Sequence, residues 1–154
     1  MRILLIEDDE EKGRAIIDFL MDEYESIVFD VARSFSSGLK SLAKGVGVYD
    51  CILLDMSMPN YDITPDEPVG GTPEGFAGIE LLAQMKLRGI NIPTIVVTMF
   101  DMFGDESNRV SLQQLIERLS EQYKPIFRGL TFYNLAENGW KASLKRQIDG
   151  VFFE

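Results

Sequence analysis

The stretch Cys51-Ile52-Leu53-Leu54-Asp55 places an acid directly after four apolar residues, and this segment decides the fold. An uninterrupted apolar run of this length, closed by a charged residue, is typical of a strand buried on both faces of a parallel sheet. An earlier run, Ile3-Leu4-Leu5-Ile6, is closed in the same way by Glu7-Asp8-Asp9. If the two runs are neighbouring parallel strands, their acids meet at one edge of the sheet.

The acids at this edge indicate a metal site. Several carboxylates in one pocket repel one another unless a cation neutralises them. Glu7, Asp8 and Asp55 offer only oxygen atoms, and this donor set suits a hard ion such as Mg²⁺. A carboxylate beside a metal ion can also attack a phosphoryl group, because that reaction needs in-line approach and charge neutralisation and little else from the protein. The sequence therefore predicts a magnesium site around one reactive aspartate, Asp55.

The rest of the chain predicts an α/β fold. Apolar runs alternate with helical patterns five times, which indicates a doubly wound parallel sheet with helices on both faces. Strands are expected near residues 2–7, 26–31, 50–55, 93–98 and 127–133. Apolar stripes predict a helix over 10–23 and four later helices, which carry Leu39 and Leu42, Leu81 and Leu82, Leu112 and Leu115, and Trp140 and Leu144.

Composition narrows the function. The 154 residues, 45% of them hydrophobic, fit one domain over 1–154 with no separate output domain. A net charge of −10 disfavours direct binding to nucleic acid. The absence of histidine excludes Ser-His-Asp catalysis, imidazole zinc sites and a phosphohistidine donor.

The sequence also gives an expectation about where the protein is located in the cell. The apolar start of the chain is short and acids follow it at once, so neither a signal peptide nor a membrane span is expected. The single Cys51 lies inside an apolar run, where a buried reduced thiol is expected. Both features favour the cytoplasm.

One segment interrupts the regular alternation. Residues 60–75 contain three prolines and no periodicity, which predicts a long loop between the third strand and the third helix. Because this segment leaves the strand that ends in Asp55, it is expected at the same sheet edge as the acids, where ligands of open parallel sheets bind. A lid, a partner contact and a tolerated surface insertion are all open for it.

With these motifs assembled, the chain resembles the receiver domain of two-component response regulators over nearly its whole length. The matching motifs are Ile6-Glu7-Asp8-Asp9, Asp55-Met56-Ser57-Met58-Pro59 and Thr98 at the end of Thr94-Ile95-Val96-Val97-Thr98. The resemblance implies the flavodoxin-like receiver fold with strand order 2-1-3-4-5.

The resemblance also implies roles for individual residues. Asp55 would be the phosphoacceptor, and Thr98 would donate its hydroxyl to the phosphoryl group. Glu7, Asp8 and Asp55, with the backbone carbonyl of Ser57, would hold Mg²⁺. Asp9 is as well explained by a place in the first turn of the first helix as by a role as ligand.

Two departures from the family pattern stand out. Receivers usually carry a lysine at the end of the fifth strand, and Lys124-Pro125 is the candidate here. The better strand is 127–133, which puts Lys124 at its start, so we favour the interpretation that the lysine is missing and that Tyr133 or Asn134 occupies its place. Met99 also follows Thr98, where the family commonly has a small residue.

Three functions are compatible with the sequence. The first is a stand-alone response regulator, phosphorylated on Asp55 by a sensor histidine kinase or phosphotransfer protein and acting on a downstream protein target, with no enzymatic activity beyond its own phosphorylation and dephosphorylation. The second is a pseudo-receiver that binds partners without phosphorylation. The missing lysine and the presence of Met99 support this function. The third is a Mg²⁺-dependent phosphohydrolase. Ser57 argues against it, because phosphatases with an aspartate nucleophile need a second acid two residues after that nucleophile.

Overall fold

The main sheet contains five parallel strands. The computed structural model describes residues 1–44, 47–62, 76–103, 109–134 and 136–153. The strands are β1 (Arg2–Ile6), β2 (Val28–Ala32), β3 (Cys51–Leu54), β4 (Thr94–Thr98) and β7 (Phe127–Phe132), in the spatial order β2-β1-β3-β4-β7. Counted within this sheet alone the order is 2-1-3-4-5, so the predicted fold class and strand order are confirmed.

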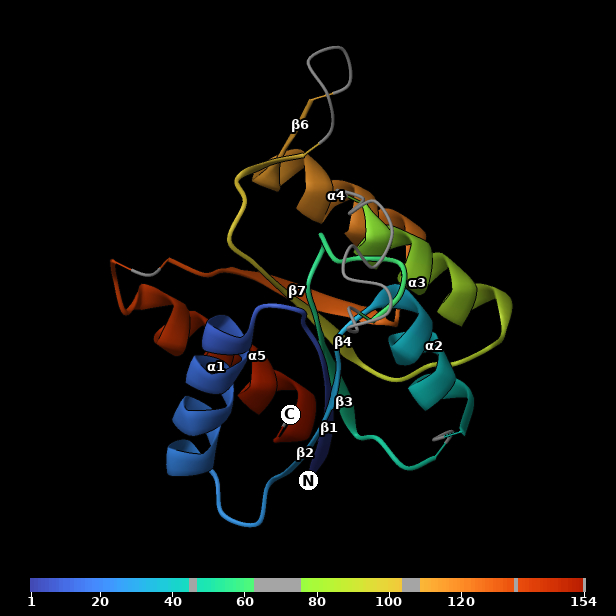
Figure 1. Ribbon diagram of the computed structural model, residues 1–154. Helices are drawn as coiled ribbons and strands as arrows, with labels where there is room; N and C mark the ends of the chain where they lie inside the picture. The colour runs from blue at the N-terminus through green and yellow to red at the C-terminus, as the bar shows by residue number, and fades with distance from the viewer. Residues whose placement is uncertain (45–46, 63–75, 104–108, 135, 154) are drawn as a thin grey trace.

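Helices cover both faces of the sheet (Figure 1). On one face lie α1 (Glu10–Glu23) and α5 (Gly139–Phe152), and on the other lie α2 (Phe35–Lys44), α3 (Ala77–Leu87) and α4 (Leu112–Gln122). Within the described ranges, no helix combines the length and the apolar character that crossing a membrane requires.

Among the described residues, the core forms two apolar clusters, one on each side of the sheet. Along β3, Ile52 and Leu54 belong to the cluster under α2, α3 and α4, while Cys51 and Leu53 belong to the cluster under α1 and α5. Successive side chains of a strand point to opposite faces, and here both faces are covered. This explains why β3 is an unbroken apolar run instead of an alternating one.

The register of the central strands brings the acids together. β1 and β3 pair in parallel from Ile3 opposite Cys51 to Ile6 opposite Leu54. The N–H of Asp55 donates to the carbonyl of Ile6 at 3.0 Å, which continues the ladder for one more step. The next residues, Glu7 and Asp55, therefore leave the sheet side by side.

Two parts of the chain differ from, or go beyond, the sequence prediction. A small antiparallel hairpin, β5 (Met102–Phe103) with β6 (Val110–Ser111), lies outside the main sheet at the start of α4 and was not predicted. Most of the predicted long loop, residues 63–75, lies outside the described residues.

Candidate functional site

Three acids converge at the carboxyl ends of β1 and β3. Glu7 and Asp8 follow β1, Asp55 follows β3, and one carboxylate oxygen from each lies within 4.8 Å of the others. Glu7 and Asp55 are buried, whereas Asp8 is exposed. An all-oxygen cluster of this kind, partly buried and open at one acid, fits a hard divalent cation.

The crowding of these acids changes their protonation. Burial, reinforced by the negative charge of Asp55, raises the pKa of Glu7 to about 8, although Lys12 opposes the shift. Partial desolvation of the Asp8 carboxyl group, in a residue that is exposed overall, raises its pKa as well, again with a contribution from Asp55. In both groups burial and the neighbouring negative charge outweigh the positive charge of Lys12, so each carboxyl group is shifted toward its neutral form.

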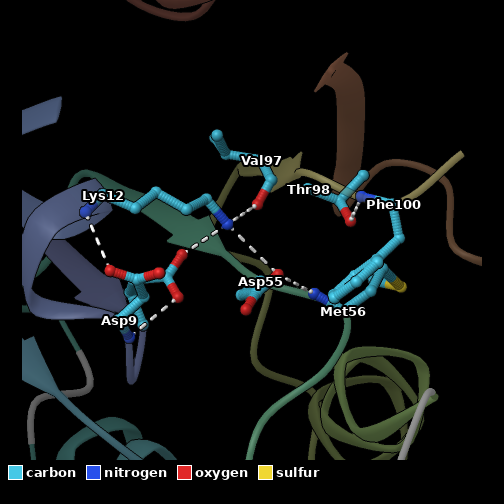
Figure 2. A network of polar contacts seen from close by, with 8 residues as sticks. Asp9, Lys12, Asp55, Met56, Val97, Thr98 and Phe100 are labelled. Carbon is cyan, nitrogen blue, oxygen red and sulfur yellow. Dashed lines mark hydrogen bonds and ion pairs between the residues drawn. The ribbon is translucent and has the colours of Figure 1, made fainter. Parts of the chain in front are cut away.

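One cation does enter the pocket, and it comes from α1 (Figure 2). The Lys12 ammonium lies 2.5 Å from Oε1 of Glu7 and 3.2 Å from Oδ1 of Asp55, and it donates a 2.8 Å hydrogen bond to the carbonyl of Val97. Its side chain is only 1% exposed. Burial lowers the pKa of this ammonium, but the carboxylates of Asp55 and Glu7 outweigh burial and raise it. Lys12 is therefore a charged side chain inside the site.

The start of α1 explains how Lys12 reaches the site. The side chain of Asp9 caps the helix by accepting the N–H of Lys12 at 3.1 Å, so Asp9 acts as a helix cap here. Side chains in a helix lean toward its N-terminus, which in α1 follows directly from β1. A first-turn side chain on the buried face therefore points at the carboxyl edge of the sheet.

Sequence reasoning missed Lys12, although a signal was present. The buried face of α1 is formed by Lys12, Ile16 and Leu20, at intervals of four residues. A lysine in register with an apolar stripe, in the first turn where helices favour acids, is unusual. Its position indicates that a negatively charged group lies near the N-terminal end of the helix.

The carboxylate of Asp55 is held in a fixed orientation. Its Oδ1 accepts the N–H of Met56 at 2.9 Å as well as contacting Lys12 (Figure 2). Ser57 follows two residues later and is half-buried. The metal-binding role expected of its carbonyl stays a prediction.

Thr98 ends β4 and is fully buried. Its Oγ1 accepts the N–H of Phe100 at 3.3 Å (Figure 2). Because the oxygen acts as acceptor in this contact, the hydroxyl hydrogen remains for donation to another group. The next residue, Met99, packs partly buried against the cluster under α1 and α5. The phosphoryl-sensing role of Thr98 also stays a prediction.

Lys124 lies away from the site. It is exposed and precedes the first residue of β7, which runs parallel to β4. Its place is therefore the amino edge of the sheet, opposite the edge of Asp55, so the structure gives no support to Lys124 as the family lysine. Tyr133 follows β7 at the correct edge, and its ring centre lies 6.0 Å from the Lys12 ammonium.

Comparison with known proteins identifies relatives along the whole chain. No protein-family model matches it. The Detocs response regulatory protein of Enterobacter cloacae is 32% identical over 148 residues, which cover 96% of this chain and 98% of that protein.

Solved structures share the fold. The response regulator TrrA of Thermotoga maritima, in complex with Mg²⁺-BeF, superposes with a TM-score of 0.59 at 17% identity, covering 95% of this chain and 97% of that one. A chain of the CheX-CheY-BeF₃-Mg²⁺ complex from Borrelia burgdorferi superposes with a TM-score of 0.67 at 16% identity, covering 100% of this chain and 90% of that one.

Proposed function

This chain belongs to the response regulator receiver family, and on that premise we propose that it is a phosphoacceptor switch whose reactive residue is Asp55. One observation carries the proposal. Asp55 leaves the centre of the sheet beside Glu7 and Asp8, within reach of a buried lysine, so a nucleophilic carboxylate, an oxygen cage for a metal and a cation occupy one pocket.

The chemical step is a phosphoryl transfer. A carboxylate oxygen of Asp55 forms a bond to the phosphorus of the donor while the bond from phosphorus to the leaving group breaks. The leaving group departs with the electron pair, as imidazole from a phosphohistidine or as acetate from acetyl phosphate. The hydrogen bond from Met56 N–H fixes the carboxylate for in-line attack.

The metal would be held by residues of this chain. Glu7, Asp8 and Asp55 are the candidate ligands, with the Ser57 carbonyl completing the set. Mg²⁺, when bound, neutralises negative charge on the transferring phosphoryl oxygens. Asp8 is the exposed member and thus the acid most open to an arriving ion, whereas Glu7 already contacts Lys12.

The switch follows from the product. An acyl phosphate on Asp55 carries added charge and acceptor oxygens. The hydroxyl of Thr98 is a donor for one of these oxygens. Thr98 is also the last residue of β4, and β5 and β6 follow it along the chain. Rotation of the Thr98 side chain toward that oxygen, on a fixed backbone, would release the N–H of Phe100 and so change the contacts of the residues that follow β4.

Membership of the family indicates which kinds of protein this chain would interact with. Receiver-domain response regulators are in general signalling proteins and not enzymes. We infer a sensor histidine kinase or phosphotransfer protein as phosphoryl donor and another protein as target, with both contacts in the cytoplasm.

Mass spectrometry of the intact protein tests the proposal. Incubation with Mg²⁺ and acetyl phosphate should add one phosphoryl group to the parent chain and none to Asp55→Asn. Asp18→Asn, an exposed acid on α1, is the matched control and should be modified like the parent. Uptake by Asp55→Asn would place the acceptor elsewhere.

The pseudo-receiver remains the second candidate because the residues directly after β7 are Tyr133 and Asn134, and neither supplies the cation that the family lysine would. It predicts that neither acetyl phosphate nor a phosphorylated histidine donor modifies the parent chain. That outcome would replace the phosphoacceptor proposal with a phosphate-independent binding module.

A further inference from the structure

The position of Lys12 has a consequence for the phosphorylated state. We propose that Lys12 of α1 is the cation that binds the phosphoryl group on Asp55, in place of a lysine from the last strand of the main sheet. The inference rests on the proposed function, because it assigns a partner to the group that this function places on Asp55.

The three donors of the ammonium support this assignment. Two of them are engaged at short distances, with Glu7 Oε1 at 2.5 Å and Val97 O at 2.8 Å. The third contact, with Oδ1 of Asp55, is longer at 3.2 Å. An ammonium has three donors, so this third one can turn to a phosphoryl oxygen on Asp55 while the other two contacts persist. A charge-assisted hydrogen bond of this kind is among the stronger ones in proteins.

The ammonium is also fixed in place before any ligand arrives. Its side chain is buried, and the bond to Val97 attaches it to β4 immediately before Thr98. The Asp9 cap holds the backbone of the first turn of α1. A donor that is already ordered loses little entropy on binding. Lys12 and Thr98 would therefore approach the phosphoryl group from neighbouring points on one rigid frame.

An aromatic ring fills the place that a lysine after β7 would take. Tyr133 is buried, its ring centre lies 6.0 Å from the Lys12 ammonium, and it packs on Trp140 at 4.8 Å between ring centres. The ring flanks the Lys12 ammonium from the end of β7. The positive charge thus comes from Lys12 of α1, while the residue after β7 contributes an aromatic ring beside it.

A purely structural role for Lys12 makes different predictions. If Lys12 serves only to neutralise Glu7 and Asp55, then Mg²⁺ can replace its charge, and a neutral variant should bind a phosphoryl analogue normally once Mg²⁺ is saturating. If Lys12 contacts the phosphoryl group, saturation with Mg²⁺ cannot compensate. The two roles are separated by measuring the analogue at saturating Mg²⁺.

Beryllium fluoride, a tetrahedral phosphoryl analogue that coordinates a carboxylate oxygen, is the probe. Its affinity is measured by calorimetry and ¹⁹F NMR at saturating Mg²⁺ for the parent chain, Lys12→Met and Lys124→Met. We expect Lys12→Met to bind it at least about tenfold more weakly, the loss of one hydrogen bond to a charged group. Lys124→Met is the matched control, since Lys124 is exposed at the opposite edge, and should bind like the parent.

The outcomes separate the two proposals. Normal affinity of Lys12→Met, with the parent binding well, overturns the role of Lys12 and leaves the phosphoacceptor proposal intact. Absence of binding to the parent chain, together with no phosphoryl uptake, overturns the phosphoacceptor proposal and this inference with it.

A measurement on the parent chain covers the case in which Lys12→Met does not fold. ¹⁵N NMR of the lysine ammonium groups follows Lys12 directly, because burial slows exchange of its protons with water. Addition of beryllium fluoride at saturating Mg²⁺ should shift the Lys12 resonance and leave the other lysine signals in place. An unshifted Lys12 signal in the bound protein would contradict the proposal.

Discussion

The charge balance of the pocket depends on Glu7. Its Oε1 contacts Lys12, and its Oε2 accepts the N–H of Asp9 at 3.2 Å. Burial, then the charge of Asp55, raises the pKa of Glu7 to about 8, while Lys12 opposes the shift. A divalent cation favours the ionised form, since a ligand carboxylate must be deprotonated. Metal binding at this pocket should therefore release a proton.

Thr98 allows a prediction that involves a single hydroxyl. Thr98→Val keeps the shape of the buried side chain but removes the acceptor of Phe100 N–H and the donor for a phosphoryl oxygen. We expect the free energy of unfolding to fall by about 1 kcal/mol. Beryllium fluoride affinity should fall severalfold, measured by calorimetry at saturating Mg²⁺.

The conservative variant distinguishes the hydroxyl from the packing. Thr98→Ser retains the oxygen and loses a methyl group, so it should bind the analogue nearly as the parent does while showing some loss of stability. Equal affinity of Thr98→Val and the parent chain would remove Thr98 from the phosphoryl pocket.

At this scale the sequence predicted the acids and not the cation. Glu7, Asp8 and Asp55 could be found because each follows an apolar strand, and strand register alone brings them to one edge. Lys12 could not be placed in the same way, because its contact depends on how α1 docks on the sheet. The family lysine was sought on the last strand, where Lys124 precedes β7 and Tyr133 follows it.

Among the elements, α3 begins against the loop that carries Asp55. A Cβ added at Gly78 would lie 2.6 Å from the carbonyl oxygen of Asp55 and 2.5 Å from Cε of Met56. The N–H of Gly78 also donates to the carbonyl of Met56 at 3.0 Å. Because the closest backbone atom belongs to Asp55 itself, the helix start sets the position of the reactive residue.

Gly78→Ala should consequently affect both stability and chemistry. The added methyl group must displace the Asp55 backbone or tilt α3, at a cost of about 1–3 kcal/mol, measured by urea unfolding. Phosphoryl uptake from acetyl phosphate should slow, because the carboxylate moves from its in-line position.

Gly139→Ala at the start of α5 is the matched control. A Cβ at Gly139 meets no atom within 4 Å, so this variant should be as stable as the parent chain or more stable by up to about 1 kcal/mol. If Gly78→Ala were equally harmless, the close approach of α3 would not position Asp55.

Element boundaries followed the sequence closely where apolar patterns are long. The helix expected over 10–23 is α1 at Glu10–Glu23, and the strand expected over 127–133 is β7 at Phe127–Phe132. The β5–β6 hairpin was missed because two-residue strands carry no periodicity.

In the molecule as a whole, the site joins the two layers of helices. Lys12 comes from α1 on one face of the sheet, whereas Gly78 of α3 packs behind Asp55 from the other face. A ligand bound at Asp55 therefore contacts or adjoins elements of both layers. Binding to the folded state alone stabilises the whole fold in proportion to occupancy.

Cys51 offers a direct measure of that global stabilisation. It lies in β3, four residues before Asp55, with its side chain completely buried, and burial raises the pKa of its thiol to about 12. At pH 8 the folded protein should therefore resist a thiol reagent, and labelling should occur through global unfolding. Beryllium fluoride with Mg²⁺ at a hundred times its Kd should slow labelling about a hundredfold, a stabilisation of about 2.7 kcal/mol.

The pH dependence of labelling provides a second check with a definite sign. A thiol whose folded pKa lies above its ordinary value of 9.0 stabilises the fold below that value, and this contribution is lost as the pH rises toward about 12. Stability measured by denaturant should therefore decline above pH 9 in the parent chain and decline less in Cys51→Ala. Labelling of the native protein at pH 8 as fast as that of a free thiol would show that β3 opens without global unfolding. In that case the strand that carries Asp55 would belong to a mobile part of the sheet, and the rigid frame inferred for Lys12 and Thr98 would not hold.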